Sequence, residues 1–129
     1  MIEKEFTLYP EAFELNQLGF DEPCFKYIYT GDTGNNVNIP CEVLPSESKN
    51  YNEDALCVST PTYSQAFRWF REKHNLFSFI TTIEHADSDG FDFTFWIAKY
   101  NIDKMPVCST YEEAELACLK EMIKIIKNK

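Results

Sequence analysis

Arg68, Trp69 and Arg71 are the residues of this chain whose types and spacing most resemble a binding site. Arginine and tryptophan dominate the strongest contacts of protein interfaces, because each covers much area and still offers hydrogen-bond donors. The three lie within 61–76, PTYSQAFRWFREKHNL, and Trp69 falls beside the apolar face of the helix predicted there. Alternatively, Trp69 packs against the N-terminal segment or the last helix, while the arginines pair with carboxylates of this acidic chain.

A second candidate surface contains Trp96 and Tyr100, which the strand pattern places with Ile80 on one face of a predicted hairpin. If no helix covers that face, these side chains form an exposed apolar patch that calls for a partner. The partner could be a second copy of the chain. If both faces are covered, the same residues belong to the core.

Catalytic and metal-binding chemistry has less support in the residue pattern. His74 and His85 could act as bases, but each falls on a predicted apolar face, and a catalytic histidine needs a nucleophile and an orienting group nearby. The cysteines include no CxxC pair, so a zinc site would need ligands from four distant segments. Asp87, Asp89 and Asp92 lack the spacing and the distal glutamate of a calcium loop. We therefore expect no catalytic, cofactor-binding or metal site.

Length, charge and cysteine usage restrict the class of protein. The 129 residues suffice for one domain with a buried core, and a hydrophobic content of 44% excludes a largely disordered chain. A net charge of −9 disfavours nucleic acid as a partner, because phosphate backbones are bound by clustered Lys and Arg. The start, MIEKEFTLYP, lacks the apolar segment of a signal peptide, and no run approaches the ~18 apolar residues of a membrane span. Five cysteines, an odd number, fit reduced thiols, so we expect a cytoplasmic protein without a membrane partner.

Three segments have the residue pattern of helices: 9–18, 61–76 and 110 to about 127. Gly19 is suited to end the first helix, and Asn75 to end the second, because both residue types tolerate the left-handed conformation. The third opens with a capping box, in which Ser109 or Thr110 is followed three residues later by glutamate. Its apolar arc is wide, which indicates burial by several neighbours.

The strand pattern covers four segments: 24–30, 37–43, a short piece at 55–59, and a hairpin over 77–97. Pro40 cannot donate a ladder hydrogen bond, so its strand should lie at a sheet edge or contain a bulge there. The turn DSDG at 87–90 fits a bulged hairpin that pairs Asp87 with Phe91 and Ile83 with Phe95. This register would gather most apolar side chains on one face.

The predicted order, α-β-β-(β)-α-β-β-α, indicates a single α+β domain over residues 1–129. We expect an antiparallel sheet of four to five strands, with three helices packed mainly on one face. The polar segment 44–54 is expected to be a mobile loop. Tyr-x-x-Ala recurs at the start of each predicted helix, beginning at Tyr9, Tyr63 and Tyr111, which fits either a duplicated αββ unit or chance.

Three segments resemble a group of small uncharacterised proteins from phages and prophages of gut Bacteroidetes: GFDEPC (19–24), PTYSQAFRWFREKHNL (61–76) and TYEEAELACLKEMIKII (110–126). The resemblance covers both ends and the middle of the chain and excludes the loop at 44–54. It implies a phage-borne accessory protein acting in the bacterial cytoplasm, where binding a host protein is a common role. It implies no activity, cofactor or catalytic residue.

The main hypothesis is a non-enzymatic protein-interaction module that binds a host or phage protein, and that could also form a homodimer. Its contact residues would be Arg68, Trp69 and Arg71, or Trp96 and Tyr100. The absence of any catalytic constellation in the residue pattern supports it.

Two other hypotheses remain open. In the first, the chain is a small-molecule-binding protein or small enzyme with a site between the central helix and the loop, where His74, Tyr51 and Glu53 could meet. In the second, the chain is an acidic decoy that occupies a nucleic-acid-binding surface, as its net charge of −9 suggests.

Overall fold

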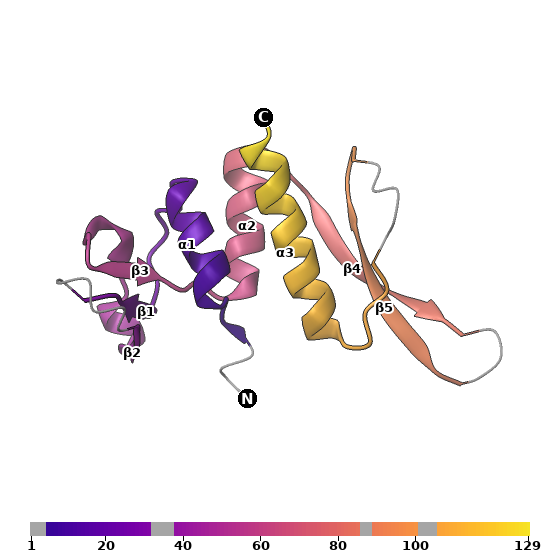
Figure 1. Cartoon of the computed structure of the whole chain (residues 1–129), viewed down its shortest axis with the longest axis horizontal. Helices are drawn as coiled ribbons and strands as arrows, with labels where there is room; N and C mark the ends of the chain where they lie inside the picture. Colours follow the sequence, from indigo (N-terminus) through magenta and orange to yellow (C-terminus); the bar gives the residue numbers. More distant parts are fainter. Residues whose placement is uncertain (1–4, 32–37, 86–88, 101–105) are drawn as a thin grey trace. The chain divides into compact units, whose positions relative to one another are not determined.

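The computed structural model describes residues 5–31, 38–85, 89–100 and 106–129 and belongs to the α+β class (Figure 1). Its elements follow in the order α1 (Tyr9–Gln17), β1 (Lys26–Tyr29), β2 (Ile39–Glu42), the 3-10 turns η2 (Pro45–Glu47) and η3 (Tyr51–Glu53), β3 (Cys57–Ser59), α2 (Tyr63–His74), β4 (Ser78–Glu84), β5 (Phe91–Ile97) and α3 (Tyr111–Lys127). Internal contacts divide the chain into two compact units, Met1–Trp69 and Phe70–Lys129, with the division inside α2.

The strands in the described residues form two antiparallel sheets, one of three strands in the order β2-β1-β3 and one of two strands, β4-β5. The α+β class and the three helices agree with the prediction, whereas the single sheet of four to five strands does not. The physical reason is that each sheet buries a face inside its own unit. In the first unit α1 contacts β3, and in the second α3 contacts both β4 and β5.

The first unit is organised by β1, which has an antiparallel neighbour on each side. Pro40 pairs with Ile28 in the edge strand β2, where its missing N–H leaves no ladder bond unmade, as predicted. Helix α1 buries Ala12 and Leu15 and is followed by Gly19 at φ +94°, a conformation that glycine adopts without strain. These local signals explain why α1 ends where its sequence indicates.

The segment 44–54 contains two short helical turns that are tied to the rest of the first unit. The backbones of Cys24 and Lys49 exchange hydrogen bonds of 2.8 and 3.1 Å. The Asn52 side chain accepts from the backbone N–H of Ser59 at 2.9 Å, and its Nδ2 donates to the Phe20 carbonyl at 2.9 Å. Tyr51 is buried. The sequence predicted a mobile loop from polarity alone, which does not show these long-range contacts.

Helix α2 begins with a reciprocal capping pair. The Thr62 hydroxyl accepts from the Gln65 N–H, and the Gln65 side-chain oxygen accepts from the Thr62 N–H, both at 3.1 Å. The helix ends before Asn75, which has φ +52°, so the predicted left-handed stop is confirmed. The residue types at both ends therefore set the length of α2.

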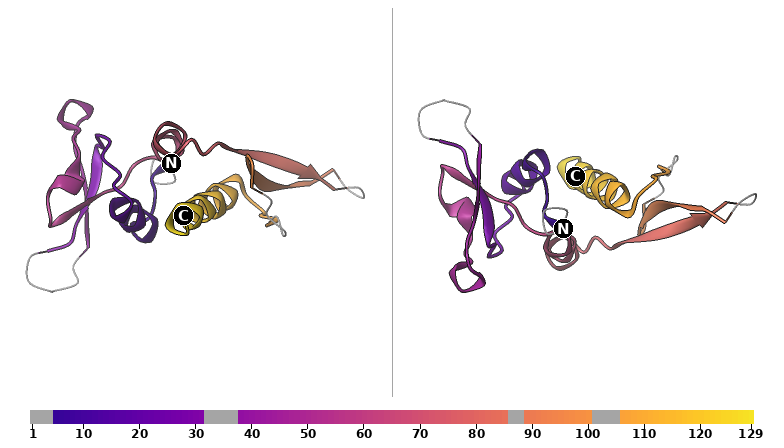
Figure 2. Two further views of the ribbon diagram at one scale, coloured as in Figure 1. Left: turned by 90° about the horizontal axis from the view of Figure 1, so that it is seen from above. Right: turned by 90° about the horizontal axis from the view of Figure 1, so that it is seen from below.

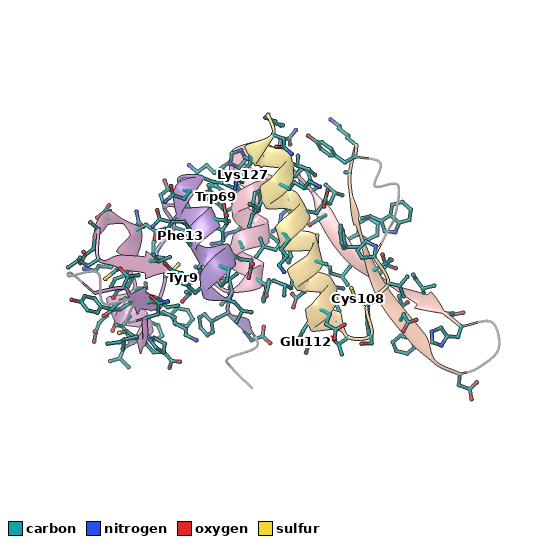
Figure 3. All side chains as sticks on the ribbon, viewed as in Figure 1. Tyr9, Phe13, Trp69, Cys108, Glu112 and Lys127 are labelled. Atoms are coloured by element: carbon teal, nitrogen blue, oxygen red, sulfur yellow. The ribbon has the colours of Figure 1, made fainter. Side chains whose placement is uncertain are left out.

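The second unit contains the end of α2 and the β4–β5 hairpin with α3 on one of its faces, as Figure 2 shows from two sides. Phe95 and Ile97 of β5 are buried on the α3 side, and from the helix Cys118 and Leu119 are buried too. Beyond β5, Phe93 and Cys108 exchange two backbone hydrogen bonds of 2.8 Å, so Cys108 lies beside this strand just before α3 (Figure 3).

The N-terminus of α3 is the predicted capping box with one change of partner. Thr110 accepts from the Glu113 N–H at 3.1 Å, as expected for the second of the two predicted boxes. The Glu113 carboxylate, however, accepts from the N–H and the hydroxyl of Ser109, both at 3.2 Å. Two residues in succession therefore help to fix this end of the helix.

The register of the hairpin differs from the prediction by three residues. Ile83 pairs with Asp92 and not with Phe95, and the predicted turn residue Asp87 lies outside the described residues. Side chains alternate between the two faces of a strand. A register shift by an odd number of residues therefore moves each side chain of β4 to the opposite face relative to the side chains of β5. As a result the apolar residues of β4 and β5 are not gathered on one face, and some of them are exposed.

Candidate functional site

At the first predicted surface, the Trp69 side chain is part of the buried core. Trp69 is only 2% exposed, and its ring lies 5.4 Å from that of Phe20 at an angle of 59°. The Arg68 Nη2 lies 3.4 Å from the Glu22 Oε1, and Arg71 is exposed. This burial corrects the contact role predicted for Trp69 and agrees with the alternative, in which the ring packs against the N-terminal segment and an arginine pairs with a carboxylate.

The second predicted surface is exposed, but its membership differs from the prediction. The observed register places on one face of the hairpin the side chains of Phe79, Thr81, Ile83, Asp92, Thr94 and Trp96. The opposite face holds Phe95 and Ile97, which are buried, so the first set points away from α3. We call this set the outer hairpin face. Within it Thr94, which lies between two larger neighbours on β5, is buried.

Three large apolar side chains are exposed on the outer hairpin face: Phe79 at 59%, Trp96 at 48% and Ile83 at 38%. Phe79 and Trp96 are directly opposite each other, so their side chains stand side by side on the sheet surface. Ile83 follows at the other end of β4, opposite Asp92. The face therefore combines an aromatic pair with an aliphatic residue whose neighbour carries a carboxylate.

Two residues predicted for this surface are placed elsewhere. Ile80 pairs with Phe95 and so points to the α3 side of the hairpin. Tyr100 follows the end of β5, where its N–H donates to the Ile97 carbonyl at 3.1 Å, and it is partly buried. The alternation within β5 correctly separated Trp96 from Phe95. The sequence missed Phe79 and Ile83 because their face depends on how β4 pairs with β5.

A histidine and a carboxylate interact at the turn end of the hairpin. The His85 Nε2 lies 2.7 Å from the Asp92 Oδ2, with both side chains partly exposed. A cavity of about 250 Å³ is lined there by Glu84, His85, Asp89, Gly90 and Phe91. Among the described residues, its lining holds carboxylates and an imidazole but no serine, threonine or cysteine. Within the described ranges, no cluster of three or more His, Cys, Asp or Glu side chains could hold a metal ion.

The thiols are mostly buried and poor nucleophiles. Of the five free cysteines, only Cys41 is partly exposed, and the others are buried. Burial raises the pKa of Cys24 to about 12, and it raises the pKa of Cys118 to about 12 as well. The Cys118 Sγ also lies 3.8 Å from the Met122 Sδ, inside the core of the second unit. A thiol in this environment stays protonated and acts as a small apolar side chain.

The residues of the predicted small-molecule site have structural roles or lie in different units. The Tyr51 ring stacks on Tyr27 with centroids 4.0 Å apart, and its hydroxyl donates to the Glu47 carbonyl at 3.2 Å. Tyr51 and Glu53 belong to the first unit, and His74 to the second. Burial and the nearby charge of Lys129 lower the pKa of His74, so its imidazole favours the neutral form.

Comparison with known proteins identifies no relative. No family model matches the chain, and neither the curated proteins nor the solved structures contain a significant match. In the part of the chain that the structure describes, none of the helices has the length and apolarity needed to cross a bilayer. The function is therefore argued from the surfaces described above.

Proposed function

We propose that this chain is a non-enzymatic protein-interaction module and that the outer hairpin face is its contact surface. The observation that carries the proposal is the joint exposure of Phe79, Ile83 and Trp96 on one face of a two-stranded sheet. Single exposed apolar residues are ordinary on protein surfaces, but adjacent ones forming a patch mark sites of association. Tryptophan is also the residue type most enriched among interface hot spots.

Covering this face would supply a useful part of a binding free energy. Fully burying a large apolar side chain is worth about 1.5–3 kcal/mol, so the exposed halves of these three contribute about 1 kcal/mol each. Together they account for roughly a hundredfold in affinity, because each 1.4 kcal/mol corresponds to a factor of ten.

The surroundings of the face indicate the chemistry of the partner. Asp92 lies on the outer hairpin face and pairs with Ile83, and Glu84 ends β4. The chain as a whole carries a net charge of −9. A complementary protein would present an apolar centre with basic groups at its rim. The resemblance to phage-borne proteins makes a bacterial cytoplasmic protein, of host or phage origin, the class of partner to examine first.

The test compares two exposed aromatic residues on separate surfaces. Trp96→Ser removes the largest exposed side chain of the outer hairpin face, and Phe13→Ser is the matched control, because Phe13 is 41% exposed on α1 (Figure 3). Immobilised parent and variant chains are exposed to a gut Bacteroidetes lysate, and retained proteins are quantified by mass spectrometry. We expect the parent and Phe13→Ser to retain the same protein, and Trp96→Ser to retain at least about tenfold less.

Two outcomes would contradict the proposal. Equal retention by Trp96→Ser and the parent would remove the outer hairpin face from the contact. Retention that is insensitive to Trp96→Ser but falls steeply as salt is added would favour the acidic decoy, because charge-based binding is screened by ions. Circular dichroism of each variant confirms that the comparison is made between folded chains.

A further inference from the structure

Strand β4 has an open edge in the described residues. It pairs with β5 on one side, and no described strand pairs with the other. The His85 N–H donates to the Gly90 carbonyl at 3.0 Å, and the Ala98 N–H donates to the Phe77 carbonyl at 2.9 Å. In an antiparallel ladder the bonded residues alternate, so the odd-numbered residues of β4 direct their N–H and C=O groups to β5. The even-numbered residues therefore direct theirs to the open edge.

This edge lacks the features that normally prevent strands from pairing between molecules. Edge strands are usually short or carry lysine, proline or a bulge. In the three-stranded sheet, the edge strand β2 follows that rule with four residues and Pro40. By contrast, β4 has seven residues, SFITTIE, without proline or glycine, and its only charge is the terminal Glu84. Its seven consecutive pairs with β5 include no bulge.

We propose that two copies of this chain associate by pairing β4 with β4, antiparallel, around a two-fold axis at Thr81. The inference rests on the proposed function and names a second copy as one partner. In this register the backbone of Ile80 exchanges hydrogen bonds with the backbone of Thr82 of the second copy. The backbone of Ser78 does the same with that of Glu84 of the second copy. All four are even-numbered residues whose backbone groups point to the open edge. The two hairpins then form one four-stranded sheet.

The same register makes the side chains self-complementary. Phe79 lies opposite Ile83 of the second copy on the outer hairpin face, so two exposed apolar residues cover each other. Thr81 meets its own equivalent at the axis. Glu84 meets the uncharged Ser78, and no two carboxylates of β4 face each other, which matters for a chain of net charge −9. Because long-range repulsion between acidic copies is screened by ions, added salt should strengthen this association.

The area available predicts a weak dimer. Phe77 and Phe79 are each about half exposed, Ile83 is 38% exposed, and an aromatic side chain can bury about 150–250 Å². The two rings thus offer roughly 200 Å² per copy, which with Ile83 and the paired backbones stays below about 1,200 Å², the lower end of specific interfaces. We expect a reversible dimer with a dissociation constant in the range of about 1 μM to 1 mM.

A disulfide across the axis tests the register directly. Residues at a non-hydrogen-bonded antiparallel pair have Cα atoms about 4.5 Å apart, within the roughly 4.4–6.8 Å that a disulfide spans. Thr81→Cys should therefore give a covalent dimer under mild oxidation, with the disulfide between the two copies of position 81 identified by peptide mapping. Thr82→Cys is the matched control, because the two copies of residue 82 would be diagonal neighbours about 7–8 Å apart or more, too far for a bridge. The partly exposed native Cys41 is present in both variants.

A backbone variant tests the edge without a new thiol. Thr82 is exposed, and its N–H points to the open edge, so Thr82→Pro removes a donor to the second copy while leaving the bonds to β5. Sedimentation equilibrium should show a dissociation constant raised at least about tenfold relative to the Thr82→Ala control. If circular dichroism shows that Thr82→Pro is unfolded, the pair of cysteine variants decides the question.

The outcomes separate this inference from the proposed function. A chain that stays monomeric to about 1 mM, with no more cross-linking of Thr81→Cys than of Thr82→Cys, would overturn the β4 pairing. If the parent chain nevertheless retains a lysate protein that the Trp96→Ser variant does not retain, the proposed function stands. A third outcome is self-association that Trp96→Ser abolishes and Thr82→Pro leaves unchanged, with no disulfide in Thr81→Cys. That outcome would show that two copies contact each other through their outer hairpin faces, and it would also overturn edge pairing.

Discussion

Phe79 and Trp96 lie opposite each other across the β4–β5 hairpin, and both are about half exposed, at 59% and 48%. The second tryptophan, Trp69, is 2% exposed and packs against Phe20. The two tryptophans of this chain therefore occupy opposite environments. This contrast favours the hairpin as the contact surface and assigns Trp69 to the core.

The two environments should be separable by fluorescence quenching. Trp69→Phe leaves Trp96 as the only indole, and Trp96→Phe leaves Trp69. At low protein concentration, acrylamide should quench Trp96 several-fold more strongly, and its emission should lie at longer wavelength, because its ring is in water. In a denaturing concentration of urea the two variants should become equal. Equal quenching of the folded variants would contradict the burial of Trp69.

Removal of the Trp69 ring should strongly destabilise the fold. Trp69→Ala leaves a cavity beside Phe20, and large-to-small changes of buried aromatic residues cost about 3–5 kcal/mol. Urea denaturation followed by circular dichroism measures the change. Trp96→Ala is the matched control and should alter the free energy of unfolding by about 1 kcal/mol, because its half-exposed ring loses only the cross-strand contact with Phe79 and the buried part of its area. Similar losses for the two variants would contradict the assignment.

The buried thiols should make stability fall at alkaline pH. The pKa of Cys24 and that of Cys118 are raised to about 12 by burial, so the folded state keeps protons that the unfolded state releases. The stabilisation is complete below the ordinary pKa of about 9 and is lost as the pH rises from there towards 12. Each thiol should contribute up to about 1.4 kcal/mol per pH unit in that window.

Urea titrations of the reduced chain at several alkaline pH values measure this slope. Cys118→Ala, which removes one of the two thiols, should reduce the slope. Thiol reagents at neutral pH should also modify Cys41 before the buried cysteines. Rapid modification of Cys118 in the folded chain would contradict its burial.

The end of α1 depends on the backbone of Gly19 and not on its surroundings. Its φ is +94°, and a Cβ added there would meet no atom within 4 Å. Gly19→Ala should therefore cost about 1–2 kcal/mol from backbone strain alone. Gln17→Ala, at an exposed position of the same helix, should be nearly neutral. Unfolding free energies of the two variants test this difference. If Gly19→Ala leaves the free energy of unfolding unchanged, the turn relaxes without strain.

Local signals in the sequence were sufficient for the helices of this protein. The helix predicted over 9–18 is observed as Tyr9–Gln17, and the one predicted over 61–76 as Tyr63–His74. Gly19 and Asn75 both have positive φ, as their residue types indicated. Caps and stops act over a few residues, so neighbouring residue types contain the necessary information. The missing N–H of Pro40 likewise predicted either an edge strand or a bulge, and β2 lies at a sheet edge.

The membership of the candidate surface was decided only by the tertiary structure. A strand shows by itself which residues alternate, and so Trp96 was correctly separated from Phe95. Which residues of β4 join Trp96 depends on the pairing between strands, and a shift of three residues brought Phe79 and Ile83 to that face in place of Ile80. The burial of Trp69 likewise depends on Phe20, 49 positions away in the chain (69 − 20). Alternation, caps and turns are local properties, whereas register and burial depend on the free energy of packing distant segments together.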